Sequence, residues 1–258
     1  MTDPKTITKA LQIFTHAIRS EGAVTAKDLS TALKLPLATT YRHIAVLEKS
    51  GLLRRTENSQ LEAGIFLLEL FRKEQFLDLL AEAARPVVQS LSQEMATVSQ
   101  LGVFDQDMVT YLVKAEPEGG EIFTRENEQL EAYCSGIGKV LLAGLPNTAF
   151  ASYLTTGPFP ALTKQTITDE RDLKTEIRRT QRRGYAIDNG EIDEGLFCIA
   201  VPVRNLQGNI IAGLSISSHD PAFVSLRIRK RVSRLHIAAD KIVCSVFKLR
   251  NIERPTPR

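Results

Sequence analysis

Residues 25–55 decide how the N-terminal part of the chain folds: TAKDLSTALKLP (25–36), LATTYRHIAVLE (37–48) and KSGLLRR (49–55). Thr25 suits the N-cap of a short helix, because Asp28 follows three positions later as in a capping box. Pro36 ends that helix or begins the next, and Gly51 ends the second helix. This order of helix, tight turn, helix and basic hairpin is typical of a winged helix-turn-helix, which inserts its second helix into the DNA major groove.

The second helix of this motif carries both apolar and polar side chains. Ile44 and Leu47 are spaced to face a core. Hydroxyl, guanidinium and imidazole groups on the opposite face can contact base edges and phosphates, and arginines of the hairpin can contact phosphates. The residues predicted to contact DNA are Thr39, Thr40, Arg42, His43, Arg54 and Arg55. The alternative interpretation is an ordinary three-helix packing unit whose polar residues are solvated.

Length and composition indicate two domains and no membrane segment. With 258 residues, 43% of them hydrophobic, the chain can bury a sizeable core. It contains no apolar run of about 18 residues and does not begin with the basic and apolar segments of a signal peptide. The chain has three cysteines, an odd number, and they lie far apart in the sequence. This usage fits a reducing compartment, so we expect a cytoplasmic protein without structural disulfides.

The net charge of +3 is unevenly distributed along the chain. Residues 1–62 carry nine Lys/Arg and six Asp/Glu, residues 63–220 carry 14 and 22, and residues 221–258 carry 10 and two. A basic head suits nucleic acid, whereas an acidic body does not, so we expect DNA contact in the head. The basic run 227–234 is either a second DNA surface or the solvated face of an amphipathic helix.

The remainder of the chain predicts an α+β body with a mostly antiparallel sheet. Strand-like runs lie at 97–104, 108–114, 185–188, 197–204 and 210–218, and helical spacing recurs at 138–143, 168–183 and 228–249. This succession of strands and helices favours α+β over a parallel α/β architecture.

Motifs for catalysis and for metal binding are weak. Gly136, Gly138 and Lys139 do not form a P-loop, because the preceding glycine spacing and the following Ser or Thr are missing. No Cys-x-x-Cys or His-x-x-x-His pair suggests zinc. The alternative function is a small hydrolase or another enzyme that uses Cys198 and carries a head like that of a DNA-binding protein, but no histidine and acid stand in a suitable context. We predict no enzymatic activity, no metal site and no cofactor.

Four blocks of the sequence together resemble the IclR family of bacterial transcriptional regulators, over nearly the whole chain. One block lies in the head, LPLATTYRH (35–43). Three lie in the body: YCSGIGKVLLA (133–143), RGYAID (183–188) with Glu191 and Glu194-Gly195, and CIAVPV (198–203) through AGLSIS (212–217). The order of the three body blocks behind a winged helix makes the resemblance specific.

The resemblance implies an effector-binding body with a GAF-like fold, which modulates DNA binding by the head. We divide the chain into a winged helix-turn-helix domain at 1–63, a helical linker at 64–84 and an effector-binding domain at 85–258. Family members bind a small organic anion, often an aromatic, sugar-derived or short keto acid. They are typically dimers and often tetramers. The expected partners are therefore double-stranded operator DNA, a small organic acid and further copies of the chain, with no membrane.

The resemblance also assigns a ligand pocket by motif position. A helix N-terminus at Gly136–Gly138 offers backbone N–H groups to a carboxylate. Tyr133 stands where the family commonly has histidine, so its phenol could stack on or hydrogen-bond an aromatic or hydroxylated acid. The predicted ligand-binding residues are Tyr133, Gly136, Gly138, Asp188, Cys198, Ser215 and Ser217. The two serines alternate along a strand and so point to one face. The alternatives are a plain polar strand face and a cysteine that only fills the core.

Overall fold

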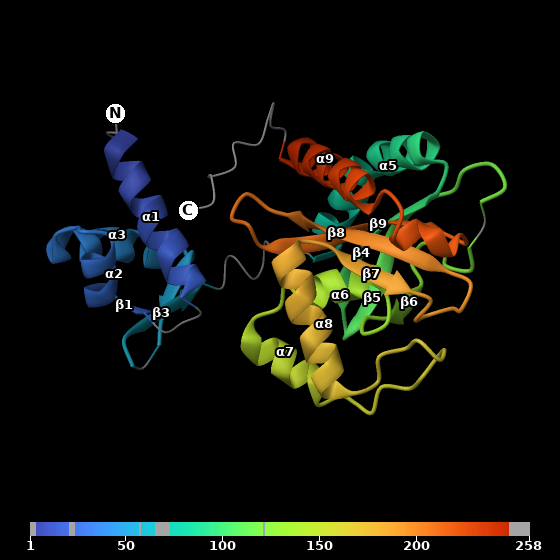
Figure 1. Cartoon of the computed structure of the whole chain (residues 1–258). Helices are drawn as coiled ribbons and strands as arrows, with labels where there is room; N and C mark the ends of the chain where they lie inside the picture. Colours follow the sequence, from blue (N-terminus) through green and yellow to red (C-terminus); the bar gives the residue numbers. More distant parts are fainter. Residues whose placement is uncertain (1–3, 21–23, 57, 65–72, 121, 248–258) are drawn as a thin grey trace. The chain divides into compact units, whose positions relative to one another are not determined.

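The computed structural model describes residues 4–20, 24–56, 58–64, 73–120 and 122–247 (Figure 1). The chain divides into two compact units, of which the first ends at Glu74 and the second begins at Gln75. Each unit has a hydrophobic core of its own. None of the described helices is long and apolar enough to cross a membrane.

The first unit is a winged helix-turn-helix, as predicted. Its helices and strands, in chain order, are α1 (Pro4–Arg19), β1 (Val24–Thr25), α2 (Ala26–Ala32), α3 (Leu37–Lys49), β2 (Leu53–Arg55) and β3 (Gln60–Ala63). The three strands form a small antiparallel sheet in the order β1-β3-β2. Thr25 and Asp28 form the predicted capping box at the start of α2, with the backbone N–H of Thr25 donating to Asp28 Oδ2 at 2.9 Å.

Glycines close the wing against the end of α3. Gly51 follows that helix with φ +72°, a conformation that residues with a Cβ rarely adopt. The backbone N–H of Gly64 donates to the carbonyl of Leu52 at 3.0 Å. A Cβ on Gly64 would lie 2.0 Å from the carbonyl oxygen of Gly51. The last strand of the wing therefore approaches α3 at a distance that only glycine permits.

The boundary between the units lies earlier than the end of the predicted linker. Residues 65–72 of that segment lie outside the described residues. Residues 73–84 belong to α5 (Lys73–Met95), a helix that continues past residue 84 without interruption. Leu80, Ala84 and Val88 of α5 are fully buried in the core of the second unit. Residues 75–84 thus belong to that unit, because their apolar stripe packs into its core.

The second unit contains a six-stranded antiparallel sheet with the order β6-β5-β4-β9-β8-β7. The strands are β4 (Val98–Asp105), β5 (Met108–Ala115), β6 (Gln129–Glu131), β7 (Ala186–Asn189), β8 (Phe197–Arg204) and β9 (Ile210–Ser218). The helices besides α5 are α6 (Gly136–Leu142), α7 (Asn147–Leu154), α8 (Glu170–Arg183), the 3-10 helix η1 (Pro221–Val224) and α9 (Ile228–Val246). The fold class is α+β, as predicted; the sequence did not reveal the short elements β6 and α7.

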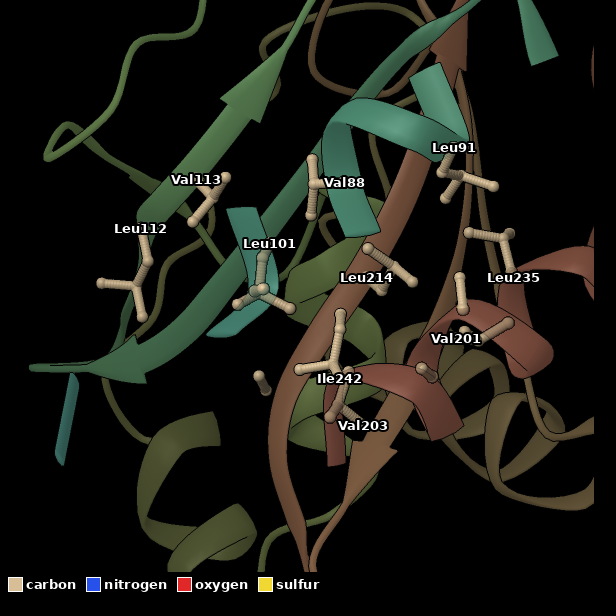
Figure 2. Packing of buried hydrophobic residues seen from close by; sticks show 14 of the residues in the cluster. Val88, Leu91, Leu101, Leu112, Val113, Val201, Val203, Leu214, Leu235 and Ile242 are labelled. Carbon is tan, nitrogen blue, oxygen red and sulfur yellow. The ribbon is translucent and has the colours of Figure 1, made fainter. Parts of the chain in front are cut away.

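The sheet separates two different environments. On one side lie α5 and α9, and on the other lie α6, α7 and α8 (Figure 1). Toward α5 and α9 the strands present an aliphatic face that packs without a polar group among the labelled side chains of Figure 2. The strand members of this aliphatic face are Leu101, Val103, Val113, Ile199, Val201, Val203, Leu214 and Ile216. Because successive strand residues point to opposite sides, their neighbours in sequence face α6.

Small residues allow α6 to lie close to the sheet. Gly102 and Gly213 are directly opposite each other on β4 and β9. A Cβ on either would meet Cγ2 of Ile137, at 3.2 Å and 2.9 Å respectively. All seven residues of α6 are buried as a result. The short helix and the sheet enclose the candidate site.

Candidate functional site

Helix α3 exposes a different set of residues from the one predicted to contact DNA. Arg42 is exposed as expected, and Thr39 is half-buried. Tyr41, which was not predicted to contact DNA, is exposed as well, with 47% of its surface accessible. Exposed Ala38 lies one turn before Arg42, so these side chains form the accessible face of the helix.

The prediction for Thr40 and His43 is wrong, because both are buried in the head. Thr40 precedes Ile44 by four positions and His43 precedes Leu47 by four, which places all four on one helical face. The Thr40 hydroxyl donates to the carbonyl of Pro36 at 3.2 Å. Burial, followed by the charges of Arg42 and Lys9, lowers the pKa of His43. The imidazole is therefore neutral near pH 7 and acts as a core residue.

The two arginines of the wing differ in their surroundings. Arg54 is largely exposed, with 63% of its side chain accessible, and pairs with Glu62 across the hairpin at 2.9 Å. Arg55 donates from Nε to Glu48 of α3 at 3.1 Å, and its guanidinium lies 5.9 Å from the ring centre of Tyr41. Arg54 is thus available to a phosphate, whereas Arg55 also ties the wing to α3.

A line of small polar side chains crosses the sheet on the side of α6. Asp188 of β7 is opposite Cys198 of β8, and Cys198 is opposite Ser217 of β9. Ser215 of β9 is opposite Gln100 of β4. We call these five residues the polar row. The Ser217 hydroxyl donates to Cys198 Sγ at 3.0 Å, and all five side chains are buried.

A cavity lies between the polar row and the start of α6. Four of the residues predicted to bind the ligand line it: Gly136, Asp188, Cys198 and Ser215. Ser217 does not line the cavity, but its hydroxyl forms a hydrogen bond to Cys198, which does. The cavity has about 10 Å³ of free space, which is room for about one water molecule. Tyr111, Thr124, Leu196 and Gln100 are among the other residues that line it; the sequence did not point to any of these four.

Besides Ser217, two predicted ligand residues do not line this cavity. The Tyr133 hydroxyl donates to the carbonyl of Pro160 at 2.7 Å, and its ring packs against Phe159 with ring centres 4.9 Å apart. It is therefore a core residue that anchors a loop. The N–H of Gly138 donates to the hydroxyl of Ser135 at 3.1 Å, which caps α6. A Cβ on Gly138 would lie 2.1 Å from the carbonyl oxygen of Ala132, so this glycine is required by close packing.

Three charged side chains lie together under α6. Lys139 is fully buried, donates from Nζ to the carbonyl of Ile187 at 2.9 Å and forms an ion pair with Glu191. The backbone N–H of Glu191 donates to Asp188 Oδ1 at 2.7 Å. Burial raises the pKa of Asp188 to about 7. The hydrogen bond from the Glu191 N–H and the charge of Lys139 act in the opposite direction and lower the pKa. Burial also raises the pKa of Glu191, opposed by Lys139.

Cys198 does not have the character of a catalytic nucleophile. It is buried, and this burial, followed by the charge of Asp188, raises the pKa of its thiol well above the ordinary value. A reactive cysteine needs a stabilised thiolate. The thiol therefore stays protonated and serves as a small polar wall of the cavity.

A segment that we call the strap, residues 122–128, closes one side of the cavity. Lys114 Nζ donates to the carbonyls of Ile122 at 2.9 Å and Thr124 at 2.5 Å. Gln100 Nε2 of the polar row donates to the Thr124 hydroxyl at 2.6 Å. On its outer side the strap borders a wider open basin of about 590 Å³, which shares Thr124 and Leu196 with the inner cavity.

The strap is also joined to α5. Both terminal nitrogens of Arg85 donate to Glu126, at 2.8 Å and 3.0 Å. Glu126 Oε1 also accepts the backbone N–H of Lys114 at 2.8 Å. The hydrogen bond from Arg85 lowers the pKa of Glu126 and so keeps the carboxylate charged. A bidentate pair of this kind fixes geometry as well as distance.

Residues 77–244 match the family described as bacterial transcriptional regulator IclR C-terminal, and residues 7–56 match a helix-turn-helix domain. The first match spans more than half of the chain. The chain belongs to the IclR family. It is a DNA-binding transcriptional regulator with an effector-binding C-terminal domain, and not an enzyme.

Similar proteins of known name support this assignment. The HTH-type transcriptional regulator KdgR of Escherichia coli K12 is 30% identical over 244 residues, 93% of this chain and 92% of KdgR. The crystal structure of Thermotoga maritima IclR aligns with a TM-score of 0.62 at 25% identity, over 95% of this chain and 99% of that one. An IclR homologue from Microbacterium hydrocarbonoxydans, complexed with 4-hydroxybenzoate, aligns with a TM-score of 0.62 at 24% identity, over 94% and 99% of the two chains.

Proposed function

We propose that this IclR-family chain binds operator DNA as a dimer and that a small organic acid in the inner cavity changes its affinity for that DNA. The observation that carries the proposal is the polar row. Its five polar side chains are buried and four of them line the cavity, whereas the opposite side of the same strands is mostly aliphatic. Buried polar groups are costly unless they are hydrogen-bonded, which makes a polar ligand a favourable occupant.

The chemical class of the ligand is inferred from the site and from a relative. The relative that holds 4-hydroxybenzoate supports an organic acid. Because the cavity has room for about one water molecule, a larger acid requires the wall to move. Thr124 and Leu196 separate the cavity from the outer basin, so we expect the acid to enter between them.

We infer that the strap carries the effect of the ligand to α5. An acid that contacts Gln100 competes with the bond from Gln100 to Thr124. The strap then shifts Glu126, which holds Arg85 of α5. Pro86 follows Arg85 and lacks the N–H of a regular helical bond, which makes bending of α5 easier at this point. The chain continues from the start of α5 toward the DNA-binding unit, and a coupling of about 1–3 kcal/mol is typical of such regulators.

We propose that α3 reads the operator through its exposed face. Arg42 and Thr39 would contact bases, and Arg54 would contact a phosphate. Thr40 and His43 are excluded because they are buried. In a dimer the two helices would occupy successive major grooves, with half-sites about 34–36 Å apart. Sedimentation of the complex with half-sites at this spacing tests the dimer and distinguishes it from a tetramer.

The first experiment measures binding to the DNA upstream of the protein's own gene, by fluorescence anisotropy at several salt concentrations. We expect tight, salt-sensitive binding by the native chain. Arg42→Ala should weaken it by about tenfold or more and relax its sequence preference. Lys27→Ala, which removes an exposed positive charge from α2, is the matched control and should have a small effect. Unchanged binding of Arg42→Ala would overturn the placement of α3.

The second experiment adds 4-hydroxybenzoate and other small organic acids to the same assay. An acid that shifts DNA affinity about tenfold corresponds to about 1.4 kcal/mol of coupling. Arg85→Gln should reduce this shift while the acid still binds. Arg234→Gln is the matched control, because Arg234 pairs with Glu94 of α5 outside the strap. Equal shifts in the two variants would exclude the route through Arg85.

A further inference from the structure

The charged groups under α6 do not balance. Asp188 and Glu191 are both buried, and Lys139 is the one buried cation beside them in the part of the chain that the structure describes. Lys139 is committed to Glu191 and to the carbonyl of Ile187. Asp188 Oδ2 and Glu191 Oε2 are buried with no hydrogen-bond partner among the described residues. One of the two carboxyl groups therefore lacks a counter-charge.

The groups that face Asp188 come from every element packed around it. They are Lys139 of α6, Glu191 of the loop after β7, Cys198 of β8, Tyr111 of β5 and Cys134 of the segment before α6. Burial raises the pKa of Cys134 to about 12 and that of Tyr111 still further, so neither supplies a charge near neutral pH. An isolated buried carboxylate is unfavourable, and protonation is the usual way in which the cost is avoided.

This leads to an inference that rests on the proposed function and specifies how its ligand is held. We propose that Asp188 carries a proton and that the cavity takes an organic carboxylate together with that proton, with the Asp188 O–H donating to a carboxylate oxygen of the ligand. The proton comes from solvent, and no covalent bond to the protein forms. Oδ2 is the oxygen that carries the hydrogen, because Oδ1 already accepts the N–H of Glu191.

The direction of the pH dependence follows from this arrangement. With the pKa of Asp188 at about 7, the free protein holds the proton at pH 6 and has largely lost it at pH 8. A bound anion adds a second negative charge and favours the protonated form. Binding should therefore take up almost no proton at pH 6 and nearly one at pH 8. Affinity should fall with rising pH, approaching tenfold per unit above neutrality.

The ligand-bound test uses isothermal calorimetry on the full chain with acetate and with 4-hydroxybenzoate as probes. Titrations at pH 6, 7 and 8 in two buffers of different ionisation enthalpy give the number of protons taken up. Asp188→Asn keeps the shape and a hydrogen-bond donor but cannot titrate, so it should bind with a flat pH profile and without proton uptake. Asp172→Asn removes an exposed carboxylate and should behave like the native chain. Binding by the native chain without proton uptake at pH 8 would overturn the proposal.

Glu191→Gln adds a test that a merely structural role would not pass. Removal of the Glu191 charge leaves Lys139 as the nearest charge to Asp188, which stabilises its ionised form. We expect the pH at which affinity begins to fall to move lower by at least one unit. An unchanged profile in this variant would contradict the proposed role of Asp188.

A measurement without ligand tests whether Asp188 is protonated, whichever acid is used as the probe for binding. The infrared difference between the native chain and Asp188→Asn should show a protonated carboxylic acid band that disappears near pH 7. A carboxylate that stays ionised down to pH 5 would overturn the proposal even if an acid binds. If neither acid binds but the band is present, Asp188 holds its proton and the carboxylate ligand is refuted. If the native chain does not bind DNA in the anisotropy assay, the proposed function is refuted instead.

Discussion

The two faces of the six-stranded sheet are built from the same strands but serve different purposes. Toward α5 and α9 the strands present mostly aliphatic side chains, which fill the core shown in Figure 2; buried Ser99, opposite Ile216, is a polar exception. Toward α6 the next residues along β4, β8 and β9 are Gln100, Cys198, Ser215 and Ser217, with glycines at Gly102 and Gly213. The first face is packed with apolar side chains, whereas the second combines a hydrophobic cluster of its own with buried polar groups and a cavity. Packing of the core and formation of the cavity should therefore be separable by single substitutions at adjacent positions of one strand.

The largest effect is expected from breaking the aliphatic face. Leu214→Ala removes a fully buried side chain and should lower the free energy of unfolding by about 2–5 kcal/mol. Ser215→Ala, at the adjacent position on the other face, should change it by less than about 1 kcal/mol. Urea denaturation of both variants provides the measurement. Equal losses would show that the polar row contributes to stability as much as the aliphatic core does.

The second prediction concerns the pH dependence of stability on the polar face. The folded-state pKa of Asp188 lies above the ordinary value of 3.8, at about 7, so the folded chain binds its proton more tightly than the unfolded chain. This contribution to stability is present at low pH and is lost as the pH rises through about 7. Between pH 5 and pH 8 the native chain should lose about 2–3 kcal/mol relative to Asp188→Asn. Denaturation of both at four pH values tests this, and parallel curves would contradict it.

Side chains along a β-strand alternate between the two faces of the sheet, which explains why part of the site could be predicted from sequence. Ser215 and Ser217 alternate along one strand, and motif position added Asp188 and Cys198; three of these line the cavity and the fourth supports it. Gln100 and Thr124 could not be found in this way. They reach the cavity because β4 pairs with β9 and the strap folds back over the sheet. Spacing along the chain does not encode such long-range pairings.

Other features can be found in the sequence by helical spacing. Thr40 and His43 are polar, but their spacing to Ile44 and Leu47 puts them on the core side of α3. Lys139 gave a usable signal as well. It is the single charged residue in a helix that is otherwise apolar, and such a helix is expected to be buried all round. A buried lysine in turn requires an acidic partner, and Glu191 of the matching motif is that partner.

The third prediction examines the close contact of α6 with the polar side. A Cβ at Gly138 would lie 2.1 Å from the backbone oxygen of Ala132, so Gly138→Ala should destabilise the chain by about 1–3 kcal/mol. At Gly136 the nearest atoms, on Ala200 and Cys198, would be 3.4 Å and 3.5 Å away, which is ordinary contact. Gly136→Ala should therefore change stability by less than about 0.5 kcal/mol. Thermal unfolding of the pair tests this, and equal melting temperatures would contradict the assigned packing.

The smallest effect is expected at Tyr133, which lies on the α6 side of the sheet but outside the cavity. Tyr133→Phe removes the hydrogen bond to the carbonyl of Pro160 and should cost about 1 kcal/mol of stability. The ring contact with Phe159 is kept, so the loop should stay in place. Because the hydroxyl does not face the cavity, affinity for 4-hydroxybenzoate should stay within about twofold, or 0.4 kcal/mol, of the native value. Calorimetric titration of the variant measures this, with Ser215→Ala as the comparison that lines the cavity. A larger loss in Tyr133→Phe than in Ser215→Ala would restore Tyr133 to the ligand site and would require the loop at Pro160 to move when the acid binds.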